Sequence, residues 1–286
     1  MRTVALGIVA MACLVAVARG GNFFQDSEMT WGDGRGKVVD GGRGLDLTLD
    51  KTSGSGFQSK TEYLFGKIDM QIKLVPGNSA GTVTTFYGGG PRRDRLRVPG
   101  QRDRRALHAA HQRVRQGAGA AGAAVPPLVR PNQGLPHLLH HLEPAARQFA
   151  VDGTAIRDFK NHEARGVSFP KSQPMRLYAS LWNADDWATQ GGRVKTDWSK
   201  APFVASFRNF NADACVMSGG AQRCPAGTME ASAAGANGGS GSWWNQELSG
   251  MGYRRMRWVQ RKFMIYNYCT DPKRVAQGLP AECKLR

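Results

Sequence analysis

The chain has 286 residues, which suits one large β domain or two small domains, and its 41% hydrophobic content is enough for a packed core. Its 36 Gly and 14 Pro indicate many turns and argue against a mainly helical fold. The net charge of +17 points to a polyanionic partner. However, eleven Arg and three acidic residues between Pro91 and Arg147 supply 11 − 3 = +8 of it without any Phe, Tyr or Trp, which argues against a nucleic-acid surface.

The first twenty residues have the pattern of a secretion signal. Arg2 gives a positive start, Val4 to Val17 is an apolar run, and Ala18 to Gly20 fits a small-x-small cleavage site. A membrane anchor is the alternative, but about 14 apolar residues are too few to span a bilayer. No other stretch is long enough, so we expect a secreted protein that begins at Gly21 and has no membrane segment.

The first part of the mature chain has the alternation and turns of a β protein. Leu45 to Asp50 and Tyr63 to Leu74 alternate apolar and polar residues, so each predicts a strand with one apolar face. Thr82 to Tyr87 is β-branched and aromatic and predicts another strand. Gly54 to Gly56 predicts a turn between the first two strands.

The strand pattern stops at Gly88 to Gly90. Residues 91–148 have neither the helical nor the strand period, and Gln116 to Ala124 contains only Gln, Gly and Ala. This basic segment therefore predicts disorder as it is written. An unstructured loop of about 58 residues is unusual inside a compact domain.

Strand patterns return after residue 148. Phe149 to Thr154 contains an Asp-Gly pair, which is typical of a hairpin turn, and Ile156 to Phe159 predicts the return strand. Met175 to Trp182 alternates as a further strand.

The C-terminal part contains three distinct segments. Residues 219–242 are rich in Gly, Ser and Ala and predict a surface loop. Trp243 to Leu248 predicts the start of a helix, whereas Arg255 to Tyr268 alternates apolar and basic residues as a strand would.

Four cysteines remain once the signal, with Cys13, is removed. An even number in a secreted chain predicts two disulfides, and of the three possible pairings the sequence neighbours are the simplest. A zinc site is the alternative, but no Cys-x-x-Cys or nearby His supports one, and five His in the basic window have no evident scaffold for a metal. The cysteines are Cys215, Cys224, Cys269 and Cys283, and the histidines are His108, His111, His137, His140 and His141.

Several specific runs stand out in the ordered flanks: Asn22 to Gln25, Pro76 to Val83, Val151 to Thr154, Ser180 to Thr189, and Arg257 to Gln260 with Tyr266 to Asp271. They closely resemble the xyloglucan endotransglucosylase/hydrolases, a plant branch of glycoside hydrolase family sixteen. The resemblance implies an all-β fold, a concanavalin-like β-jelly-roll sandwich at 21–210 with an open groove for a glucan chain. It also implies a C-terminal extension at 211–286 that carries two disulfides between neighbouring cysteines.

The same resemblance implies a catalytic strand with the sequence HDEIDFEF. Alternate residues of a strand share a face, so its three carboxylates point into the groove and the outer two flank the scissile bond. In this chain the three positions hold Arg93, Arg95 and Arg97. A guanidinium neither attacks as a nucleophile nor donates a proton at useful pH, so we expect no catalytic residue and no activity in the chain as written.

A displaced reading frame accounts for this substitution. One permitted codon choice for Pro91 to Pro99, read one base later, encodes HDEIDFEF, and the same shift stays family-like through Arg115. Leu135 to Pro144, shifted in the same way, gives FHTYSIIWN. We therefore interpret about 88–148 as an out-of-frame translation of the usual catalytic segment, and we expect central strands of the sandwich to be disrupted there.

The resemblance also implies residues that bind the glucan chain. Asp186, Trp187 and Gly191 match positions that line the groove, and Arg255 matches a basic groove residue near the extension. A core Trp is the alternative for Trp187, and a solvated strand Arg is the alternative for Arg255.

For an in-frame product, the resemblance implies a secreted, monomeric enzyme of the apoplast and cell wall. It would cleave the β-1,4-glucan backbone of xyloglucan by a retaining mechanism and pass the fragment to a xyloglucan or oligosaccharide acceptor, or less often to water, without a metal or cofactor. A non-catalytic xyloglucan-binding protein is a second hypothesis, although the lost strands argue against a stable fold. A third is a basic protein that binds nucleic acid or acidic pectin through residues 92–115; secretion argues against nucleic acid.

Overall fold

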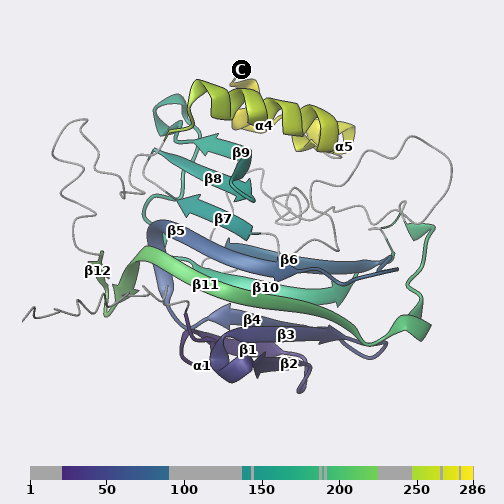
Figure 1. The fold of residues 1–286 in the computed structure, drawn as a ribbon. Coiled ribbons are helices and arrows are strands. Elements are labelled where there is room, and N and C mark those ends of the chain that lie inside the picture. Colours follow the sequence, from purple (N-terminus) through teal and green to yellow (C-terminus); the bar gives the residue numbers. More distant parts are fainter. Residues whose placement is uncertain are drawn as a thin grey trace, which may run out of the picture.

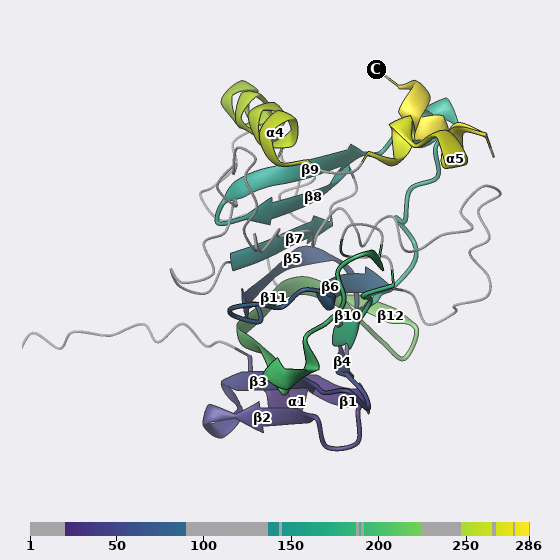
Figure 2. The same ribbon diagram turned by 90° about the vertical axis from the view of Figure 1, so that its right-hand side faces the viewer.

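The computed structural model describes residues 21–89, 137–142, 145–186, 189, 192–224, 247–264, 267–276 and 278–285. Within these ranges the chain forms two antiparallel sheets that pack face to face, with few helices (Figures 1 and 2). This arrangement, with two disulfides, is the all-β jelly-roll sandwich with a disulfide-containing C-terminal extension that the sequence predicts.

The smaller sheet has four strands in the order β1-β4-β10-β6, and each neighbouring pair is antiparallel. Its strands are β1 (Ser27–Trp31), β4 (Ser55–Ser59), β10 (Arg176–Asn183) and β6 (Thr82–Gly89). In the described part of the chain, β6 is therefore an edge strand of this sheet.

The larger sheet has the order β2-β3-β11-β5-β7-β8-β9, and the short β12 pairs with β11. Its strands are β2 (Gly36–Val39), β3 (Gly44–Leu49), β11 (Phe203–Ser218), β5 (Glu62–Lys73), β7 (His137–Leu142), β8 (Ala146–Val151), β9 (Thr154–Lys160) and β12 (Ala221–Arg223). The strands predicted between residues 45 and 182 are thus confirmed, and so is the hairpin at Asp152 and Gly153, which lie between β8 and β9.

The helical elements lie outside the two sheets. The longest is α4 (Gly250–Phe263), which lies along β9 at the edge of the larger sheet (Figure 1). The others are α1 (Phe23–Asp26), α5 (Pro272–Val275) and the 3-10 turns Asp40–Gly42, Glu163–Arg165, Trp198–Lys200, Tyr268–Thr270 and Ala281–Lys284.

The main core fills the space between the sheets. Alternate residues of each strand point inward, so Leu181 of β10, Leu47 of β3 and Phe207 of β11 are all 0% exposed. Phe207 packs edge to face against Phe57 of β4, with ring centroids 5.1 Å apart. Burying each such side chain stabilises the fold by about 1.5–3 kcal/mol.

A second, smaller core lies where β5, β9 and β11 meet. Its buried members are Leu64, Phe65, Phe169, Met175 and Cys215, and Phe159, Met217 and Cys224 pack against them. The rings of Phe159 and Phe169 are stacked 6.2 Å apart. This cluster fixes the β8–β9 hairpin to the rest of the sandwich.

The prediction of disorder over 91–148 is wrong for two segments that the structure describes. Residues 137–142 form β7, which pairs with β5 on one side and β8 on the other, and residues 146–148 belong to β8. Backbone N–H and C=O groups make these bonds whatever the side chains are, so a segment without alternation completes the sheet. Residues 90–136, 143 and 144 lie outside the described residues.

The turn predicted at Gly54 to Gly56 is also wrong. Ser55 and Gly56 belong to β4, and the chain bends instead at Lys51 and Thr52. Asp50 stabilises this bend because its Oδ1 accepts hydrogen bonds from the backbone N–H groups of Thr52 and Ser53, at 2.8 and 3.0 Å.

The C-terminal prediction needs two corrections. Arg255 lies on a helix and not on a strand, because the residues around it repeat with a helical period. The helix α4 begins at Gly250, after Ser249, whose Oγ accepts the N–H of Gly252 at 3.1 Å. Of the helix start predicted at Trp243 to Leu248, Glu247 and Leu248 are not helical, and the rest lies outside the described residues. Most of the loop predicted at 219–242 lies beyond the described ranges. The division at residue 210 stays a prediction, and β11 runs across it.

Candidate functional site

The outer face of the four-stranded sheet, on the side away from the core, is where the structure gathers aromatic and hydroxyl side chains, most of them half-buried. Tyr178 and Ser180 of β10 point to this face because Leu177, Ala179 and Leu181 point to the core. Antiparallel pairing places Tyr87 beside Tyr178, and their rings are stacked with centroids 5.3 Å apart. The hydroxyls of Thr85 and Ser180 lie 2.5 Å apart and share a hydrogen bond.

Trp31 adds a third ring to this sheet. It ends β1, it is 43% exposed, and its indole lies over Gly54 and Gly56 of the neighbouring strand region. A Cβ at Gly56 would lie 2.5 Å from Trp31 Nε1, so a side chain there would displace the ring. A broad, half-exposed ring of this kind offers an apolar surface to a sugar.

Ion pairs and hydrogen bonds fix one end of the outer face. Arg176 Nη1 lies 3.4 Å from Glu28 Oε1, and Arg176 Nε lies 3.4 Å from Glu62 Oε1. Gln58 Nε2 donates to the same Glu28 oxygen at 2.5 Å. Partly exposed pairs of this kind contribute about 0–1 kcal/mol each, so their main effect is to orient the side chains.

The loop after β10 contains Asp186, one of the predicted substrate-binding residues. Its side chain is 90% exposed, and its Oδ1 accepts a hydrogen bond from Lys195 Nζ at 3.0 Å. This hydrogen bond is the largest cause that raises the pKa of Lys195. Trp187 and Gly191 lie outside the described residues.

A buried hydrogen-bond set holds this loop against the start of β6. Asp185 Oδ2 accepts the N–H of Thr196 at 3.0 Å, and this bond is the first cause that lowers the pKa of Asp185. Thr196 Oγ1 donates to the carbonyl of Ala80 at 3.0 Å. Gly81 has φ +81, and a Cβ there would lie 2.1 Å from Thr196 Oγ1, so the close approach needs a glycine.

Arg255 lies on a different part of the molecule. It is exposed on α4, which is attached to β9 by two hydrogen bonds: Tyr253 Oη donates to Asp158 Oδ2 at 2.7 Å, and Gln260 Nε2 donates to the carbonyl of Ile156 at 3.0 Å. Asp186 follows a strand of the smaller sheet, whereas α4 covers the edge of the larger one. Substrate binding by these two residues stays a prediction.

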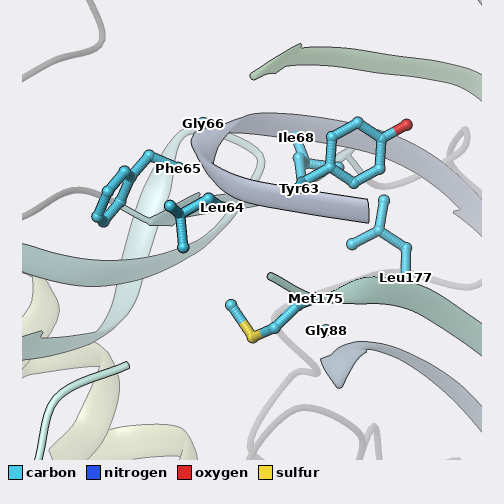
Figure 3. Close-up of a pocket in the computed structure, with 8 residues that line it drawn as sticks. All are labelled: Tyr63, Leu64, Phe65, Gly66, Ile68, Gly88, Met175 and Leu177. Atoms are coloured by element: carbon cyan, nitrogen blue, oxygen red, sulfur yellow. The ribbon is translucent and has the colours of Figure 1, made fainter. Parts of the chain in front are cut away.

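An apolar pocket opens where β5 bends at Gly66, near Gly88 at the end of β6 (Figure 3). A Cβ at Gly66 would lie 2.2 Å from the Cβ of Ala214, so only glycine allows the two strands to approach there. Burial raises the pKa of Tyr63, which also lines the pocket, to about 12. The remaining lining residues, Leu64, Phe65, Ile68, Met175 and Leu177, supply no acid, base or nucleophile.

The disulfides are Cys215–Cys224 and Cys269–Cys283, so pairing of sequence neighbours is confirmed. Within the described ranges, no group of three or more His, Cys, Asp or Glu is placed to hold a metal. In the same part of the chain, every helix is too short or too polar to cross a bilayer. Arg93, Arg95 and Arg97 lie outside the described residues.

Two family descriptions match the chain. "Glycosyl hydrolases family 16" matches residues 23–96 and 141–200, and "Xyloglucan endo-transglycosylase (XET) C-terminus" matches residues 238–283. The first match is interrupted from 97 to 140, inside the segment that has no strand alternation.

Curated relatives match along nearly the whole chain. "Xyloglucan endotransglucosylase/hydrolase protein 22" of Arabidopsis thaliana is 50% identical over 285 residues, 96% of this chain and 95% of the relative. "Xyloglucan endotransglucosylase protein 1" of Diospyros kaki is 48% identical over 288 residues, 98% of this chain and 93% of the relative. "Xyloglucan endotransglucosylase/hydrolase 2" of Glycine max is also 48% identical, over 98% of this chain and 94% of its own length.

Proposed function

We propose, from the premise that the chain belongs to the xyloglucan endotransglucosylase/hydrolase family, that it keeps a scaffold for xyloglucan but as written cannot cleave it. The reaction of an in-frame product is cleavage and religation of the β-1,4-glucan backbone of xyloglucan in the cell wall. One observation carries the loss of activity: the sequence has Arg93, Arg95 and Arg97 where the resemblance leads us to expect three carboxylates, and the first part of the family match ends at residue 96.

The chemistry explains why arginine cannot substitute there. A retaining transglycosylase needs one carboxylate to attack the anomeric carbon and a second acid to protonate the leaving oxygen. The glycosyl group of this enzyme ester then passes to a sugar hydroxyl or to water: the enzyme carboxylate leaves, and the second group, now a base, takes the proton of the acceptor. A guanidinium has no lone pair for attack and keeps its proton, and three positive charges oppose a transition state that itself becomes cationic.

Two observations support the displaced reading frame. The interruption of the family match, from 97 to 140, falls inside the segment of about 88–148 whose shifted reading encodes HDEIDFEF and FHTYSIIWN. The second shifted run covers Leu135 to Pro144, and β7 forms within it. A corrected frame would therefore place a run rich in β-branched and aromatic residues where the sheet already has a strand.

The N-terminal pattern and the disulfides support secretion to the apoplast. Xyloglucan and its oligosaccharides are the partners that this location and the family favour. A second candidate, a non-catalytic xyloglucan-binding protein, is supported by the outer face of the four-stranded sheet, where Trp31 is 43% exposed beside the half-buried, stacked rings of Tyr87 and Tyr178.

Three secreted proteins test the proposal: the verified chain, a version in which 88–148 is replaced by the shifted reading, and the same replacement with Arg93, Arg95 and Arg97 kept. Transfer from xyloglucan to a labelled xyloglucan oligosaccharide is measured for each. We expect activity only in the second, with the other two at least roughly 10⁴-fold slower. Because the third protein shares the replaced strands, it separates loss of the carboxylates from loss of the fold.

Binding distinguishes the two candidate functions. Retardation of the verified chain in a xyloglucan gel without turnover supports the binding protein. Turnover by the verified chain at a rate close to that of the corrected one would refute the proposal. A peptide mass map across Arg97 establishes that the tested polypeptide has the written sequence.

A further inference from the structure

The outward side of α4 carries four cations around one aromatic ring. Trp258 is 47% exposed. The residues that neighbour it on a helix surface, at i−4, i−3, i+3 and i+4, are all cations and all exposed. They are Arg254, Arg255, Arg261 and Lys262, and together with Trp258 we call them the Trp258 basic face.

These four cations have no carboxylate partner among the residues that the structure describes. The helix contains no Asp or Glu, and Glu247, just before it, pairs with Lys160 at 3.5 Å. Exposed helices commonly alternate acids with bases, and neighbouring like charges destabilise a helix. The four positive charges on α4 therefore stay without a neutralising partner in the described structure unless an anion from outside supplies one.

The opposite side of the helix is already occupied. Met256 and Val259 are buried against β9, and Tyr253 and Gln260 hydrogen-bond to that strand. The helix lies along β9 (Figure 1), and because its buried side faces that strand, the Trp258 basic face lies on the exposed side of the helix. Since the apolar side is not free, α4 cannot enter a bilayer as an amphipathic surface helix does.

We propose that the Trp258 basic face binds an acidic polysaccharide, a polyuronate with one carboxylate on each sugar. Arginine pairs with carboxylates through two parallel hydrogen bonds, and an indole offers an apolar surface for the C–H face of a sugar ring. Arg254 and Lys262 are separated by eight residues, about 12 Å along the axis, so cations flank the ring on both sides and engage successive sugars.

This site is separate from the outer face of the four-stranded sheet, and it takes a charged polymer where that face takes a neutral one. The choice of a polysaccharide over a nucleic acid rests on the proposed wall location. A chain that holds an acidic wall polymer on α4 would stay in the wall while the sandwich engages xyloglucan.

The test uses the full secreted chain and affinity electrophoresis in gels with polygalacturonate. Arg254→Gln combined with Arg261→Gln should weaken binding about twentyfold and reduce its dependence on salt. The control, Lys37→Gln combined with Lys51→Gln, removes the same charge from exposed positions near β2, the opposite edge of the larger sheet, and should change binding less than about twofold. Trp258→Ala should weaken binding without changing the salt dependence.

Two further comparisons keep the result interpretable. Fully methyl-esterified polygalacturonate has the same backbone without the charge and should not bind. Arg254→Lys with Arg261→Lys keeps the charge and should retain most of the affinity, which excludes helix unfolding as the cause of a loss. Xyloglucan retardation, measured on the same proteins, should stay unchanged and so reports separately on the proposed function.

Three results would overturn the proposal. The first is that Arg254→Gln with Arg261→Gln weakens binding no more than Lys37→Gln with Lys51→Gln does. The second is that the methyl-esterified polymer binds as tightly as polygalacturonate. The third is that double-stranded DNA or phosphatidylserine vesicles bind more tightly than polygalacturonate through the same residues.

Discussion

The hydroxyl of Tyr253 is the contact through which the attachment of α4 to β9 can be measured. It donates to Asp158 Oδ2 at 2.7 Å, while Asp158 Oδ1 is buried without a hydrogen-bond partner in the described structure. Tyr253→Phe keeps the ring, which lies 5.5 Å from Lys160 Nζ, and removes the hydroxyl, which also hydrogen-bonds to Lys160 and thereby raises the pKa of Lys160. A buried acceptor that loses its donor costs about 1–3 kcal/mol, so we expect the free energy of unfolding to fall by about 2 kcal/mol and Tm by about 4–8 °C.

Trypsin provides the local assay, because α4 carries five Arg and Lys residues that are cut only when the helix opens. If the helix opens separately from the sandwich, a loss of about 2 kcal/mol makes cleavage within α4 about 30-fold faster. Tyr178→Phe is the matched control, since no described residue hydrogen-bonds to its hydroxyl. Unchanged Tm and unchanged cleavage in Tyr253→Phe would show that the hydroxyl does not hold the helix.

Three further changes test the core and the titrating groups. The pKa of Tyr63 is raised to about 12, so its contribution to the free energy of unfolding is complete below the ordinary pKa of 10.0 and is lost as pH rises toward 12. Denaturant titrations of Tyr63→Phe should therefore show a smaller loss of stability at alkaline pH. The pKa of Asp185 is lowered below 3.8, so its contribution to the free energy of unfolding is present above pH 3.8 and is lost as pH falls through the lowered pKa. Asp185→Asn should therefore make Tm less dependent on pH in the acid range. Leu181→Ala, at a position that is 0% exposed, should lower the free energy of unfolding by about 2–5 kcal/mol in urea.

Local patterns predicted the strands well because alternation is itself the cause of one-sided burial. Leu45, Leu47 and Leu49 alternate in the sequence, and all three are at most 2% exposed in the structure. Strand β7 has no such signal: Leu138 pairs with Met70 and Val151, and these partners can be identified only from the completed sheet.

The helix α4 shows how a short window misleads. Arg255 and Arg257 alternate with Met256 and Trp258, which favours a strand when only adjacent residues are compared. Over the whole segment, Met256 and Val259 are three apart and share the buried face, which is the helical period. A longer window would have found the helix.

The outer face of the four-stranded sheet could not have been assembled from the sequence. Tyr87 and Tyr178 stack only because β6 and β10 pair in one particular register. Trp31 reaches the same sheet because Gly54 and Gly56 leave room for its ring. Gly54 and Gly56 are visible in the sequence as positions without a side chain, but the sequence does not show that β1, which carries Trp31, pairs with their strand.

The second, smaller core has a consequence for how the protein is made. Cys215 is 0% exposed among Leu64, Phe65 and Phe169, whereas its partner Cys224 is only partly buried. An oxidant therefore reaches this pair through the Cys224 sulfur, and Cys215 closes the bridge by attacking that sulfur from inside the cluster. Once closed, the bridge is shielded on its Cys215 side, so a reductant in the surrounding medium can approach it only through Cys224.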